Sequence, residues 1–210
     1  MDLRDGLLFF LILVSSLCIH EWAHAWVADK LGDPTPHNEG RVTLNPAAHI
    51  DLVGTILFPL FCIFASTSGF FLGWARPVSV NASYFKHPGR DDTLVTLAGP
   101  LSNFALTLLA AIVGALTVRF FPQTVELAGR MIEVNAWLFV FNMLPIPPLD
   151  GGRILRYFVG MSWETFAMIS RWSMFVLLGV LFFSDRIKIL FAIAIGIAAT
   201  PAEILFKLLT

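Results

Sequence analysis

The sequence feature that most constrains this chain is an apolar run at about residues 7–27 that contains His20-Glu21-Trp22-Ala23-His24. Because roughly 20 apolar residues cross a bilayer as a helix, the run is long enough to span the membrane. His20 and His24 are four positions apart, so they lie on one face of such a helix. Two imidazoles in this relation can hold one zinc ion, and Glu21 can act as general base on a water at the metal.

The apolar setting decides between two interpretations of this motif. On the surface of a soluble helix, the same letters can arise by chance, with both histidines satisfied locally. Inside a membrane span no water is present to satisfy Glu21, and ionisable groups there are costly unless they serve a function. The motif therefore predicts a metal site at membrane depth. We expect the run to be a retained span rather than a cleaved signal peptide.

The composition supports an integral membrane protein. Of 210 residues, 57% are hydrophobic and only 14% are charged, against roughly 25% charged in soluble domains. The chain has no basic run that would bind a nucleic acid. We expect a multi-pass protein in the lipid bilayer of a cell membrane. It would form one transmembrane domain over residues 1–210, with a catalytic core at about 7–156 and accessory helices at about 165–209.

Further apolar runs predict an all-α integral membrane protein with about five to six membrane helices. They lie at about residues 52–72, 94–118, 125–144, 166–183 and 187–209. Residues 73–81 indicate a re-entrant or extended β-like segment before the glycine-proline helix at 94–118, because Pro77 and the alternation of Val78 to Val80 favour extended chain. Run 52–72 is then expected to enter as a helix and return as this segment. Residues 41–44 could form a second short strand, and residues 84–92 are expected to be a charged loop.

A catalytic zinc site needs a third protein ligand, and Asp150 is the best candidate. It is a lone carboxylate at the end of an apolar helix, followed by Gly151 and Gly152, which permit tight backbone packing. An ordinary turn is the alternative, but the histidine pair upstream favours the metal role. His37 and His49 lack helical spacing to another metal-type residue and are expected to be loop residues. The zinc ligands would lie near the C-terminal ends of two helices, which must then run parallel.

The segment before Asp150 predicts an opening in the helical structure. Pro145, Pro147 and Pro148 break the preceding helix and release backbone groups that need partners. At membrane depth such backbone is tolerated only inside protein or beside a water-filled cavity, which a hydrolytic zinc requires. Asn142 could donate to an oxyanion or to the substrate backbone, or it could cap the broken helix.

These residues carry a resemblance to the site-2 protease family of intramembrane zinc metalloproteases. The matching motifs are His20-Glu21-x-x-His24, Ala98-Gly99-Pro100-x-x-Asn103 and Asn142-x-x-Pro145-x-Pro147-Pro148-Leu149-Asp150-Gly151-Gly152. Two further motifs resemble the short bacterial branch without a PDZ or CBS domain: Gly40-Arg41-x-Thr43-Leu44-Asn45-Pro46 and Gly73-Trp74-Ala75-Arg76-Pro77-Val78. The resemblance covers most of the chain up to about Arg156.

The resemblance implies an intramembrane protease that cleaves transmembrane protein substrates in the bacterial inner membrane. One Zn²⁺ per chain would be bound by His20, His24 and Asp150, nearer the cytoplasmic side, with Glu21 as the base. The two extended segments could hold an unwound substrate by backbone pairing. The expected substrate-binding residues are Asn142, Asn103, Trp74, Arg76, Pro77 and Val78.

Two other classes of function use the same residues. A zinc-binding membrane transporter would place these ligands in a permeation path and needs further intramembrane sites along it. The sequence offers one cluster, which favours the enzyme. A non-catalytic scaffold for transmembrane partners would not need the general base, and the presence of Glu21 argues against it.

Overall fold

The computed structural model describes residues 3–65 and 73–210 and is all-helical, with no strand among the described residues. Among these, three helices are long and apolar enough to cross a membrane: α1 (Leu3–Lys30), α4 (Pro88–Thr117) and α8 (Asp185–Leu209). The predicted helical class and three of the predicted runs are thus confirmed. The chain divides into a first unit, Met1–Ser102, and a second unit, Asn103–Thr210, and α4 contributes to both.

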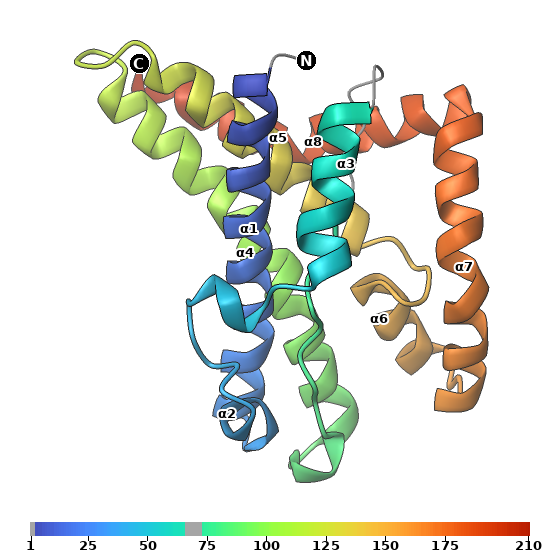
Figure 1. The fold of residues 1–210 in the computed structure, drawn as a ribbon. Coiled ribbons are helices and arrows are strands. Elements are labelled where there is room, and N and C mark those ends of the chain that lie inside the picture. Colours follow the sequence, from blue (N-terminus) through green and yellow to red (C-terminus); the bar gives the residue numbers. More distant parts are fainter. Residues whose placement is uncertain (1–2, 66–72) are drawn as a thin grey trace. The chain divides into compact units, whose positions relative to one another are not determined.

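The first unit is organised around α1. This helix packs against the short helix α2, the 3-10 turn η1 and the helix α3, and Figure 1 shows α1 and α3 side by side. Ala28 of α1 and Val95 of α4 are fully buried in one cluster with Phe85. The other elements of this unit are α2 (Thr35–Asn38), η1 (Pro46–Ala48), the π-helix η2 (Leu52–Leu57), α3 (Phe58–Ala65) and η3 (Ala82–Tyr84).

The second unit is built from the C-terminal part of α4 and four further helices. They are α5 (Thr124–Asn142), α6 (Asp150–Phe158), α7 (Trp163–Phe183) and α8. α5 packs along α8, with Ala136 of α5 against Ala198 and Ala199 of α8, and these small side chains allow close approach. Ser162 and Ser184 begin α7 and α8 by accepting hydrogen bonds from backbone amides of the first turn.

The expected strand at residues 41–44 is wrong: this stretch is bent. The physical reason is the side chain of Arg41, which turns inward and donates to backbone carbonyls instead of extending from a sheet edge. Residues 73–81 are non-helical, as Pro77 predicted, but they form no strand. Their amides bond singly to scattered partners, including Gly54 and His49.

One boundary also differs from expectation. α4 begins at Pro88, inside the predicted charged loop, because proline suits the first helical turn and the Asp91 carboxylate accepts a hydrogen bond from the His87 amide. The predicted return of run 52–72, at residues 73–81, is non-helical, and the end of the run itself, residues 66–72, lies outside the described residues. The predicted break before Asp150 is confirmed, since α5 ends at Asn142 and α6 begins at Asp150.

Candidate metal centre

The centre of the first unit is the pair His20 and His24, buried on one face of α1. Their Nε2 atoms are 3.1 Å apart and their rings meet edge to face at 82°. Two nitrogen ligands on one tetrahedral zinc, each about 2.0–2.1 Å from it, would be about 3.3 Å apart. The pair therefore has the spacing of two ligands on a single ion.

The tautomer of His24 is set by a backbone carbonyl. Its Nδ1 lies 2.7 Å from the carbonyl oxygen of Val95, on α4. A carbonyl can only accept, so Nδ1 carries the proton and Nε2 presents its lone pair. This is the arrangement that metal-binding histidines use, with the second ring nitrogen bonded to a partner that fixes the ring.

Gly99 of α4 borders both Nε2 atoms. A Cβ at this position would lie 2.3 Å from Nε2 of His24 and 2.6 Å from Nε2 of His20, closer than real Cβ contacts. Only glycine keeps this space beside the two lone-pair donors open. The nitrogen spacing, the tautomer and this space together fit a bound zinc. The sequence motif contained Gly99 but gave no reason for it.

The candidate base Glu21 is held by the extended segment. Its Oε2 accepts a hydrogen bond of 3.0 Å from the backbone N–H of Val78. Of the predicted substrate-binding residues in this segment, Val78 is buried, whereas Arg76 and Pro77 are exposed. The structure thus brings Val78 to Glu21, a contact that sequence spacing could not indicate because 57 positions separate the two residues.

Trp74 anchors the start of the same segment. Its N–H donates to the Gly54 carbonyl over 3.1 Å, and its own carbonyl accepts from the Thr55 hydroxyl over 2.7 Å. The indole packs on Gly54, where a Cβ would lie 2.2 Å from the ring, and has its centroid 5.8 Å from that of Phe58. These contacts fix the segment in place, and a substrate-binding role for Trp74 stays a prediction.

In the second unit, Asp150 stands in the first turn of α6 rather than at the end of a helix, which corrects the sequence interpretation. Its Oδ2 atom is buried. A Cβ at Gly151 would lie 2.4 Å from the Leu144 carbonyl oxygen, and one at Gly152 would lie 2.5 Å from the Pro147 nitrogen. The two glycines therefore pack directly on the proline-broken backbone, as predicted.

The two candidate asparagines have partners within the second unit. Nδ2 of the fully buried Asn103 donates to Oδ1 of Asn135 over 3.0 Å, and Nδ2 of Asn135 donates to the Met131 carbonyl over 2.9 Å. Asn142 donates to the Leu138 carbonyl one turn earlier, in keeping with the helix-end alternative. Sequence reasoning missed Asn135, which joins α5 to α4. Contacts of Asn103 and Asn142 with a substrate stay predictions.

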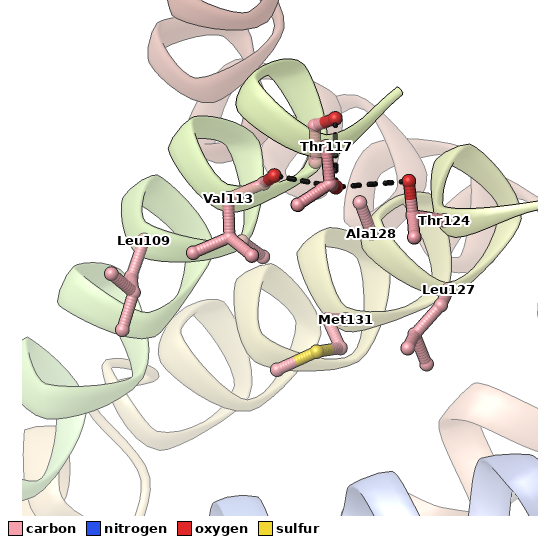
Figure 2. Close-up of a pocket in the computed structure, with 9 residues that line it drawn as sticks. Leu109, Val113, Thr117, Thr124, Leu127, Ala128 and Met131 are labelled. Atoms are coloured by element: carbon pink, nitrogen blue, oxygen red, sulfur yellow. Dashed lines mark hydrogen bonds between the residues drawn. The ribbon is translucent and has the colours of Figure 1, made fainter. Parts of the chain in front are cut away.

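A pocket in the second unit has no titratable side chain in its lining. Figure 2 shows apolar side chains of α4 and α5 around it, with the Thr117 hydroxyl bonded to the Val113 carbonyl and the Thr124 hydroxyl. Its volume is about 200 Å³. The pocket is therefore no candidate for a hydrolytic or metal site.

Among the residues that the structure describes, His20 and His24 of the first unit and Asp150 of the second are buried side chains of a metal-binding type. Binding of one ion by all three is accordingly part of the proposal below.

The long apolar helices and the buried histidine pair define a helical membrane protein with a candidate zinc centre. A family model described as "Peptidase family M50" matches residues 121–183. The YwhC protein of Bacillus subtilis is 42% identical over 152 residues, which cover 69% of this chain and 65% of the relative. Together these comparisons confirm the predicted resemblance to peptidase family M50, the site-2 protease family of integral membrane proteins.

Two further relatives match at lower identity. Rip2 of Mycobacterium tuberculosis strain H37Rv is 35% identical over 141 residues, which cover 65% of this chain and 51% of the relative. MJ0392 of Methanocaldococcus jannaschii, named a zinc metalloprotease, is 25% identical over 150 residues, which cover 70% of this chain and 33% of the relative. The chain thus spans less than two thirds of each of these relatives. No solved structure matches it.

Proposed function

We propose that this protein is an intramembrane zinc metalloprotease that hydrolyses peptide bonds of transmembrane protein substrates. One Zn²⁺ per chain is bound by His20, His24 and Asp150, and Glu21 is the general base. The observation that carries the proposal is the histidine pair, with Nε2 atoms 3.1 Å apart beside the Cβ-free position of Gly99. A pair of histidines with one carboxylate is a common catalytic zinc set.

The chemistry that zinc supplies when bound is a water acidified to a pKa of about 7 and a polarised substrate carbonyl. Glu21 takes the proton of the attacking water and later delivers it to the leaving amine. Because Oε2 of Glu21 is held by the Val78 amide, we assign the proton transfer to Oε1. His24 keeps its orientation through the Val95 carbonyl during the reaction.

We propose that the substrate approaches residues 74–80 from the side of the exposed Arg76 and Pro77 side chains. A transmembrane substrate has its amides locked in helix and must unwind locally before it can be cleaved. The amides of Trp74, Arg76 and Val78 already donate to partners in this chain. Other backbone groups of the segment would therefore pair with the unwound substrate.

The architecture that we propose is one metalloprotease domain over residues 1–210, with five to six membrane helices in the bacterial inner membrane. α1, α4 and α8 have the length and composition of membrane helices. α5 and α7 are the further spans of this proposal, since an apolar helix of 19 or 21 residues is long enough. The bilayer and a transmembrane protein substrate are the partners.

The test is Glu21→Gln, which keeps an oxygen acceptor for the Val78 amide but cannot take a proton. We expect this variant to retain one zinc per chain, measured by metal analysis of the purified protein, and to lose cleavage. Quantitative proteomics of membranes containing wild type or variant then identifies the substrates as transmembrane proteins that stay uncleaved only with Glu21→Gln. Glu164→Gln, which removes one negative charge at an exposed position, is the matched control. A fully active Glu21→Gln enzyme would overturn the base assignment.

A further inference from the structure

Arg41 is a buried cation that contacts the same extended segment as the candidate base, although it is neither a ligand nor a base. Its residue is 3% exposed, and its guanidinium donates to three backbone carbonyls, those of Ala48, Arg76 and Pro77. Burial lowers the pKa of Arg41, and the negative charge of Glu21 acts in the opposite direction. A rigid planar fork of donors suits this bridging of separate carbonyls better than an ammonium does.

One peptide group joins Arg41 to Glu21. The carbonyl of Pro77 accepts from Nη2 of Arg41 over 2.8 Å, and the N–H of Val78 donates to Oε2 of Glu21 over 3.0 Å. These two atoms belong to the same peptide plane, which is rigid and has its C=O and N–H pointing in opposite directions. A donor that fixes the carbonyl therefore fixes the direction of the amide as well. Hydrogen bonds in such a chain also polarise one another.

The remaining anchors of the segment act on other peptide groups. The Arg76 amide donates to the His49 carbonyl over 2.9 Å, and the Asn81 amide donates to Oδ2 of Asp33 over 2.7 Å. These bonds hold the segment on either side of the plane between Pro77 and Val78. Arg41 is the described side chain that contacts this plane opposite Glu21.

We propose that Arg41 is a positioning residue for the general base. It holds the peptide group between Pro77 and Val78 so that the Val78 N–H orients the Glu21 carboxylate toward the attacking water. The inference rests on the proposed function, in which Glu21 is the base, and assigns to the first unit a role in the geometry of catalysis.

Arg41→Lys and Arg41→Gln test this role in the full-length protein. A lysine keeps the charge but cannot bridge the same carbonyls, and glutamine loses both. We expect kcat to fall about 10–100-fold in Arg41→Lys and further in Arg41→Gln, with KM and zinc content near wild type. Arg90→Gln removes one positive charge at an exposed position of α4. It is the matched control and is expected to leave kcat unchanged.

Hydrogen–deuterium exchange gives a readout that needs no substrate. We expect the Val78 amide to exchange at least about 10-fold faster in both Arg41 variants than in wild type or Arg90→Gln, with or without zinc. Glu21→Leu removes the acceptor and should also speed exchange at Val78, whereas Glu21→Gln should not. The two Glu21 variants test the hydrogen bond between Val78 and Glu21 independently, should the Arg41 variants fail to fold.

The outcomes separate the two proposals. Wild-type exchange at Val78 and wild-type kcat in Arg41→Lys would overturn the positioning role, even with Glu21→Gln inactive. Fast exchange in Arg41→Lys, together with an active Glu21→Gln enzyme, would keep the structural link but refute Glu21 as the base.

Discussion

Replacement of Gly99 by alanine tests the metal centre most directly. The added Cβ would lie 2.3 Å from Nε2 of His24, whereas ordinary contact begins near 3.4 Å. The imidazole must therefore retreat by about 1 Å, several times the roughly 0.2 Å that a zinc–ligand distance tolerates. Lesser changes, in groups that only orient a ligand, already cost about 10–100-fold in metal affinity. We expect Gly99→Ala to weaken zinc binding by more than about 100-fold.

The assay is a competition titration of the purified protein in detergent against a chromophoric zinc chelator, with metal content measured in parallel. Gly129→Ala on α5 is the matched control, because nothing lies within 4 Å of a Cβ at that position. Alanine favours a helix over glycine by about 1 kcal/mol, so loss of zinc in Gly99→Ala could not be blamed on helix propensity. Wild-type zinc affinity in Gly99→Ala would refute the reasoning, because it would mean that the ion does not bind beside Gly99.

Two further substitutions test the surroundings of the site. Asn135→Ala removes the acceptor of the buried Asn103 amide. We expect it to lower the free energy of unfolding in micelles by about 1 kcal/mol, measured by denaturant titration. An unchanged midpoint would show that this side-chain pair does not stabilise the packing of α4 on α5. Gly54→Ala places a Cβ 2.2 Å from the Trp74 ring, so we expect faster exchange across residues 74–78 and a lower kcat at unchanged zinc content. Exchange and kcat like those of wild type would show that Trp74 does not anchor the segment.

The long helices and the histidine pair were predictable because each depends on local sequence alone. A bilayer forces its spans to be apolar and helical, and spacing of four residues puts His20 and His24 on one face wherever the helix lies. The proline break before Asp150 was predictable for the same reason, since proline cannot continue a helix interior. The start of α4 could also have been read from Pro88 and Asp91, which are typical signals of a helix N-terminus.

The contacts around the site could not be predicted in the same way. The alternation at residues 41–44 favours a strand, but Arg41 finds its carbonyl partners near residues 48, 76 and 77, and those partners decide its conformation. The value of Gly99 lies in the empty space beside two rings from another helix. Such effects depend on how distant segments pack, and no periodicity in the chain records them.

The partner that fixes His24 is a main-chain carbonyl, and this affects how the site can change over generations. Every amino acid presents the same oxygen, so substitutions at Val95 that preserve the local packing leave the proton on Nδ1. A carboxylate partner, by contrast, could be lost through a single codon change. The position of the α4 backbone therefore sets the tautomer of His24. Only an insertion, deletion or distortion that moves the helix would remove this control.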